Sequence, residues 1–132
     1  MNLRGFFCFM IRIGTDIIEI SRIEQNLSNG AFLKRVYSPK ELSFFPHPWG
    51  RENMAARFCA KEALIKVLGQ WVPMNEVSIL NDENGRPYYE LEGSAEALCR
   101  TLNMKSIDLS ISHCRDYAVA FAVGQCDDER QV

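Results

Sequence analysis

The fold is decided by residues 57–68, which read RFCAKEALIKVL. This stretch has the pattern of a helix that is apolar on nearly every side, and such a helix is normally buried. On a helical wheel Arg57 and Lys61 share one edge, whereas Glu62 and Lys66, four residues apart, share another. Burying an unpaired carboxylate costs on the order of several kcal/mol, so Glu62 needs a partner. Lys66 in an intrahelical ion pair is one candidate partner, and a bound cation is another.

A second carboxylate lies in an unusual setting. Asp16 interrupts the apolar run IGTDIIEI at residues 13–20. An aspartate after Gly-Thr at a strand end often accepts hydrogen bonds from local backbone, which is one interpretation. A divalent cation shared with Glu62 is the other, and it would compensate both carboxylates. The two residues are 46 positions apart and form no specific motif, so both interpretations stay open.

Helices are marked by their capping signals. The segments Ser21–Glu24 and Ser38–Glu41 both have capping-box spacing, which predicts a helix N-terminus at each. Proline at the first helical position strengthens the second signal. The expected helices are residues 21–29, a short one from residue 38 that stops before Pro46, 52–68 ending at Gly69, and 95–102 capped by Ser94.

Strands are indicated by alternating apolar residues between turn signals. The expected strands are 11–13 ending at Gly14, 77–80 and 88–91 joined by the Asn84-Gly85 turn, and a final hairpin of 107–112 and 117–123. In the last strand alanines alternate with larger residues, which predicts close packing against a helix or another subunit. The fold class predicted is therefore α+β: a single small domain over residues 1–132, with an antiparallel sheet and packed helices.

The N-terminal residues 1–9 stand apart from this pattern. Leu3 to Met10 form a short apolar lead-in with one arginine, too short for a secretory signal. Two interpretations stay open: an extra strand segment, or a native start at Met10.

Composition narrows the functional classes. Apolar residues make up 47% of the chain and charged residues 24%, as in ordinary globular proteins. A net charge of −2 and the lack of a basic run argue against a nucleic-acid partner. No apolar run approaches the length of a membrane span, so no membrane partner is expected. Five cysteines without a C-x-x-C pair are typical of reduced, packing cysteines in a cytoplasmic protein.

Two further residues are candidates for anion binding. His113 sits at the turn of the final hairpin behind Ser112, where it is either a solvated turn residue or a donor to a phosphate. Arg86 follows the Asn84-Gly85 turn, where its guanidinium and the backbone N–H groups of the turn could meet a phosphate. An exposed hairpin tip without a ligand is the alternative interpretation for Arg86.

Four blocks of the sequence together resemble a known family. They resemble, in order along the chain, the signatures of the holo-acyl-carrier-protein synthases, the short bacterial-type 4'-phosphopantetheinyl transferases. The resemblance covers Met10 to about Val123, and the order of the blocks makes it specific. The blocks are IGTDIIEISRI at 13–23, RFCAKEALIK at 57–66, NGRP at 84–87, and LSISH at 109–113 followed by YAVA at 117–120.

This resemblance implies a specific reaction in fatty acid biosynthesis. The family transfers the 4'-phosphopantetheine arm of coenzyme A to a serine of an apo acyl carrier protein. The other product is 3',5'-adenosine bisphosphate. The family is typically trimeric, with each active site between two subunits. The implied partners are therefore coenzyme A, an acyl carrier protein and two further copies of the chain, in the cytoplasm.

The resemblance also implies a role for individual residues. Asp16 and Glu62 map to the carboxylates that hold Mg²⁺, and with Lys66 they make up the catalytic set. Arg22 maps to a contact for the acidic carrier protein. The implied contacts to coenzyme A are Lys66, Arg57, Asn84, Gly85, Arg86, Pro87, Ser112 and His113.

Two departures from the family pattern concern the ends of elements. Residues 2–9 precede the usual start, which favours Met10 as the native start. The family often has a glycine-rich loop after the long helix, and this chain has QWVPM at 70–74 instead. Two other functions are considered. A metal-dependent phosphohydrolase of a nucleotide diphosphate would use the same carboxylates to activate water. A non-catalytic carrier-protein or nucleotide-binding module is the other, and the presence of Asp16, Glu62 and Lys66 together argues against it.

Overall fold

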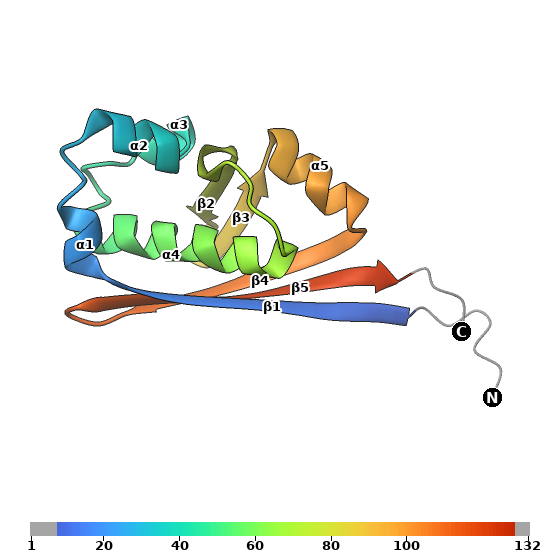
Figure 1. Cartoon of the computed structure of the whole chain (residues 1–132). Coiled ribbons are helices and arrows are strands. Elements are labelled where there is room, and N and C mark those ends of the chain that lie inside the picture. The colour runs from blue at the N-terminus through green and yellow to red at the C-terminus, as the bar shows by residue number, and fades with distance from the viewer. Residues whose placement is uncertain (1–7, 129–132) are drawn as a thin grey trace.

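A three-stranded antiparallel sheet carries one long helix along one of its faces (Figure 1). The structure is a computed structural model that describes residues 8–128. The strand order is β1-β5-β4, so the C-terminal strand lies in the middle. The elements are β1 (Cys8–Glu19), β4 (Met104–His113), β5 (Tyr117–Asp128) and the long helix α4 (Arg51–Leu68). The final hairpin and the long helix are confirmed, including the left-handed Gly69 that ends α4.

Small residues let α4 lie very close to the sheet. Ala118, Ala120 and Ala122 of β5 are completely buried, and they alternate with residues on the other face. A side chain at Gly14 of β1 would collide with the carbonyl oxygen of Ala63 in α4. The alanine face is therefore covered by a helix of the same chain. Of the two interpretations, packing against a helix is confirmed, and an interface with another subunit is wrong for this face.

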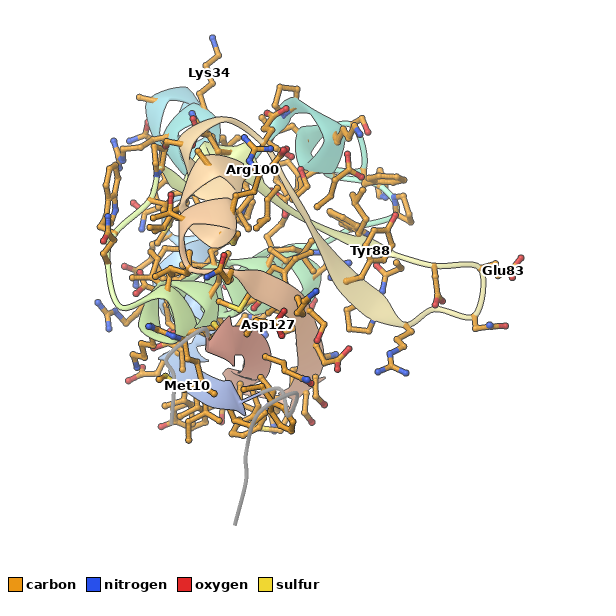
Figure 2. The ribbon with its side chains drawn as sticks, turned by 90° about the vertical axis from the view of Figure 1, so that its right-hand side faces the viewer. Met10, Lys34, Glu83, Tyr88, Arg100 and Asp127 are labelled. Carbon is orange, nitrogen blue, oxygen red and sulfur yellow. The ribbon has the colours of Figure 1, made fainter. Side chains whose placement is uncertain are left out.

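A second layer lies on the other side of α4 (Figure 1). It contains the hairpin of β2 (Val77–Asn81) and β3 (Pro87–Leu91), which agrees with the sequence prediction. Figure 2 shows the tip of this hairpin, at Glu83, projecting away from the body. The remaining elements are α1 (Ile20–Glu24), α2 (Gly30–Val36), α3 (Pro39–Leu42), the 3-10 helix η1 (Met74–Glu76) and α5 (Gly93–Thr101).

A buried ion pair joins these layers. Lys61 of α4 is fully buried, and its Nζ lies 2.6 Å from Glu41 Oε1 of α3, which is also fully buried. Lys61 also donates to the carbonyl oxygens of Met74 and Val77, and Glu41 accepts from the backbone N–H of Ile79. Every charge-bearing atom of the pair thus has partners, as a buried pair requires.

The structure corrects the predicted end of the first strand and the predicted first helix, and for Cys8 and Phe9 it supports the interpretation as an extra strand segment. β1 does not end at Gly14, because the strand pairs with β5 continuously up to Glu19. Cys8 and Phe9 belong to this strand, and residues 1–7 lie outside the described residues. Ser21 caps no helix, since α1 already begins at Ile20, and α1 ends at Glu24 rather than near residue 29.

Two other caps differ from the sequence prediction, while one agrees. Asn29 caps α2, a helix that the prediction lacks, by accepting from two backbone N–H groups. α5 begins at Gly93, and Glu76 rather than Ser94 accepts the N–H of Ala95. The capping box at Ser38 is confirmed in full. A carboxylate from a distant segment can replace a local cap, which a local motif does not reveal.

The face of the sheet opposite α4 carries exposed apolar side chains. Ile13 is 62% exposed, Ile17 65% and Phe121 45%, and all three lie on this open face by the register of β1 and β5. Apolar patches of this kind usually mark interaction sites. Within the described residues, no helix is long and apolar enough to cross a membrane.

Candidate functional site

The two carboxylates singled out by sequence line the same hollow. Asp16 lies on the α4 side of β1, opposite Ala120, and Glu62 lies on the facing edge of α4. The hollow measures about 450 Å³, and its lining includes Asp16, Glu62, Phe58 and Arg22 of α1. The side chain of Asp16 is 20% exposed. The close contact between α4 and the sheet therefore brings together residues 46 positions apart in sequence.

Electrostatics distinguish the two carboxylates. Burial raises the pKa of Glu62, the negative charge of Asp16 raises it further, and Lys66 opposes these effects. Lys66 Nζ lies 3.6 Å from Asp16 Oδ1 and donates to the carbonyl oxygen of Thr15 at 2.7 Å. Lys66 thus pairs with Asp16, and within the described residues it forms no ion pair with Glu62. The intrahelical ion pair that the spacing offers is not formed.

This donor set fits a magnesium ion. Mg²⁺ prefers oxygen ligands and is usually held by one or two carboxylates together with water and substrate phosphates. Asp16 and Glu62 supply two carboxylates, and among the described residues no third acidic, histidine or cysteine side chain closes a cage around them. An incomplete cage leaves coordination positions open for a substrate. Burial and the charge of Asp16 raise the pKa of Glu62, and a cation beside the two carboxylates would oppose both effects.

A buried thiol, Cys59, lies close to the carboxylates, and the sequence predicts only a packing role for it. Cys59 Sγ donates to the carbonyl oxygen of Ala118 at 3.3 Å. Burial raises the pKa of the Cys59 thiol, and the charges of Asp16 and Glu62 raise it further. The thiol therefore stays protonated and is no nucleophile. The apolar helix pattern that surrounds Cys59 was the only available signal for its burial.

Arg57 lies on the other edge of α4, away from this hollow. Its guanidinium stacks 3.7 Å from the ring centroid of Trp49 and donates to Asn53 and Asn81. Arg57 is buried, and this burial lowers its pKa to about 10. Asn81 in turn donates to the carbonyl oxygen of Gly85 at 2.9 Å. The structure thus connects Arg57 to the hairpin turn.

The predicted anion-binding turn is only partly available. The backbone N–H groups of Asn84 and Arg86 donate hydrogen bonds to Asp82 Oδ1. The backbone N–H of Gly85 donates to the carbonyl oxygen of Asp82. These N–H groups are therefore used within the turn, which corrects the expectation that they meet a phosphate. The exposed guanidinium of Arg86 lies 3.9 Å from Asp108. Pro87 begins β3, as the sequence predicts.

Ser112 and His113 lie at the end of β4, and both are exposed. His113 pairs with Ala118 of the central strand β5, and Ala118 pairs with Ile18 of β1. Ile18 lies two residues after Asp16, so it is on the same side of the sheet as Asp16. His113 therefore shares the α4 side of the sheet with Asp16, whereas Ser112 points to the open face. The structure thus brings Asp16, Glu62 and Arg22 to one hollow, with Lys66 paired to Asp16. Arg57 and Arg86 do not line this hollow.

Comparisons with known proteins identify the family of this chain. Residues 12–122 match the family model described as the 4'-phosphopantetheinyl transferase superfamily. The chain belongs to this superfamily. Its relatives include the holo-[acyl-carrier-protein] synthase of Dehalococcoides mccartyi strain 195, 44% identical over 122 residues, which are 88% of this chain and 99% of that protein. The enzyme of the same name from Halothermothrix orenii is 39% identical over 88% of this chain and 98% of its own length.

Solved structures show the same fold. The holo-[acyl-carrier-protein] synthase of Neisseria meningitidis superposes with a TM-score of 0.80 at 32% identity, over 87% of this chain and 98% of that one. A synthase–coenzyme A complex from Chronobacterium ammoniagenes superposes with a TM-score of 0.79 at 30% identity, over 89% of this chain and 98% of that one. The predicted family and fold class are therefore confirmed.

The raised pKa of Glu62 predicts the effect of Glu62→Gln on stability. A carboxyl group whose pKa is higher in the folded than in the unfolded state lowers the free energy of unfolding once it is ionised. In EDTA at neutral pH, Glu62→Gln should therefore raise the free energy of unfolding, by less than about 1 kcal/mol because solvent screens a partly exposed group. The gain should vanish as the pH falls below the ordinary glutamate pKa of 4.5.

Urea denaturation across pH checks this prediction. Glu83→Gln, at the exposed hairpin tip, is the matched control and should leave the free energy of unfolding unchanged. A clear loss of stability in Glu62→Gln would instead make Glu62 a member of a structural ion pair.

Proposed function

We propose that this chain transfers the 4'-phosphopantetheine group of coenzyme A to a serine of an apo acyl carrier protein, with Asp16 and Glu62 as its magnesium ligands. The family match supports the reaction. The residue assignment is supported by Asp16 and Glu62, which line one hollow, and by Lys66, which pairs with Asp16. Bound Mg²⁺ would supply charge neutralisation at the diphosphate of coenzyme A. The products are holo acyl carrier protein and 3',5'-adenosine bisphosphate.

The remaining roles, charge neutralisation and contacts to phosphate, are assigned to side chains of this chain. Lys66 is 53% exposed, so its ammonium group can leave Asp16 and neutralise charge on the transferred phosphoryl group. Phosphoryl transfer depends mainly on positioning and charge neutralisation, which these three side chains can provide. His113 lies on the same side of the sheet and offers a further donor to phosphate. Arg86, Ser112 and the buried Arg57 are assigned to coenzyme A by resemblance, as are Asn84, Gly85 and Pro87 of the turn.

Intact-mass spectrometry of an apo acyl carrier protein tests the proposal. Incubation with this protein, coenzyme A and Mg²⁺ should add the mass of one phosphopantetheine arm to the carrier. A chelator or Glu62→Ala should abolish the gain, whereas Glu83→Ala at the hairpin tip should not. Breakdown of coenzyme A without modification of the carrier would favour the phosphohydrolase. Binding of coenzyme A without any reaction would favour the non-catalytic module.

Arg22 is proposed as a carrier-protein contact. It lines the edge of the hollow on α1 and is exposed, so it can meet an acidic partner close to the reacting groups. Arg22→Ala should raise the KM for carrier protein by about tenfold, and high salt should reduce the difference between variant and wild type. Affinity for coenzyme A, measured by calorimetry, should stay unchanged. Equal loss of both affinities would contradict this assignment.

The open face of the sheet is proposed to pair with further copies of the chain. The exposed Ile13, Ile17 and Phe121 form an apolar surface on the face that α4 leaves uncovered. We take three as the number of copies from the family resemblance. Ile13→Lys should dissociate the oligomer in sedimentation equilibrium, and Tyr88→Lys, at an exposed position of β3, should not. A wild-type protein that sediments as a monomer at micromolar concentration would contradict the proposal.

A further inference from the structure

Lys66 of α4 is bound to the neighbouring strand β1 at two successive residues. Its Nζ donates to the carbonyl oxygen of Thr15 at 2.7 Å and lies 3.6 Å from Asp16 Oδ1. β1 is an edge strand of the sheet, so some of its backbone carbonyl groups have no partner strand. Lys66 satisfies one of these carbonyl groups and compensates the charge of Asp16 at the same time. Among the described residues, Asp16 is the sole carboxylate in an ion pair with Lys66.

The path of the Lys66 side chain follows from the glycine beneath it. A Cβ on Gly14 would come within 3.1 Å of Lys66 Cβ, so the lysine stem lies directly on β1 at this position. From there the side chain extends along the strand toward Asp16, two residues further on. In the opposite direction lies Arg12, which donates to a backbone carbonyl oxygen in the last turn of α4 at 3.3 Å. A turn of Lys66 toward Arg12 would bring two positive charges together, so the carboxylate side is favoured.

Asp16 therefore has two candidate cations for one carboxylate group. Mg²⁺ binds carboxylate oxygens at about 2.1 Å, so a metal on Asp16 Oδ1 would lie close to the Lys66 ammonium group. Two cations at such a separation repel each other, so each lowers the affinity of the carboxylate for the other. The side chain of Asp16 is only 20% exposed, so solvent screens this repulsion less than at an open surface. The side chain of Lys66 is 53% exposed and can move away.

We propose that Lys66 competes with the divalent cation for Asp16, and that the phosphates of coenzyme A end this competition by drawing Lys66 away. The protein then binds the metal weakly by itself and tightly together with coenzyme A, so the binding of the two is cooperative. Lys66 thus sets the affinity for the metal, in addition to its proposed contact with the transferred phosphoryl group. This inference rests on the proposed function, because it takes Asp16 and Glu62 as the metal ligands and coenzyme A as the substrate.

Titration of the protein with Mn²⁺ in the absence of coenzyme A, with the free ion measured by electron paramagnetic resonance, tests the competition. Mn²⁺ takes the same oxygen ligands as Mg²⁺, and Mg²⁺ should displace it. Lys66→Met keeps the side-chain stem and removes the charge, so it should bind Mn²⁺ about three- to tenfold more tightly than the wild type. Combination with Asp16→Asn should remove this gain. Circular dichroism verifies that each variant is folded.

The same titration with saturating coenzyme A, corrected for Mn²⁺ bound by coenzyme A alone, measures the cooperativity. Coenzyme A should tighten Mn²⁺ binding in the wild type by a factor at least about three times larger than in Lys66→Met. The reason is that only the wild type has a competing ammonium group for the phosphates to draw away. An equal factor in both proteins would overturn the proposed movement of Lys66.

Lys105→Met is the matched control. The side chain of Lys105 is 62% exposed and its Nζ lies 3.1 Å from Asp127 Oδ2, so this variant also removes one positive charge and frees one aspartate. Asp127 lies near the far end of β5, so Mn²⁺ binding should stay as in the wild type. Equal or weaker Mn²⁺ binding in Lys66→Met would overturn the inference and leave the metal site standing, as would equal tightening in Lys105→Met. Mn²⁺ binding that is absent from both the wild type and Lys66→Met would overturn the metal site as well.

Discussion

The close contact between α4 and the small-residue face of the sheet is the constraint on which the rest of the structure depends. Gly14 and the alanines of β5 remove side-chain bulk, so the helix backbone approaches the strands directly. At this separation the side chains of Asp16 and Glu62 line one hollow. Overpacking in such a contact costs on the order of 1–3 kcal/mol or more, so a methyl group at Gly14 would disturb both the fold and the site.

The two edges of α4 have different roles: one makes buried structural contacts, and the other carries the candidate functional side chains. On one edge Lys61 is buried with Glu41, and Arg57 is buried against Trp49 with a link to Asn81. Burial lowers the pKa of Lys61 while Glu41 opposes that shift, so the pair depends on its many hydrogen bonds. These contacts hold the second layer in place. On the other edge Glu62 lines the hollow and the exposed Lys66 pairs with Asp16, so solvent and a substrate can reach both side chains.

Sequence patterns predicted the helices, caps and strands that are determined by residues close together in the sequence. The long helix, the capping box at Ser38 and the final hairpin each carry their signal within a few residues, and the structure confirms them. The cap of α5 was missed because its acceptor, Glu76, comes from another segment. The partner of Lys61 was missed for the same reason, since Glu41 lies twenty residues earlier. Asp16 and Glu62 were found because a carboxylate in an apolar run is conspicuous, but only the tertiary contact shows that they meet.

The charges around the hollow favour a functional rather than a structural role for the pair of Asp16 and Glu62. A fold selected for stability alone would give Glu62 a close cation, as it gives Lys61 a close anion. Instead Lys66 pairs with Asp16, and the pKa of Glu62 is raised by burial and by the neighbouring charge. Natural sequences break local rules of stability mainly at functional sites. A cation bound between Asp16 and Glu62, as proposed, would oppose both of the effects that raise the pKa of Glu62.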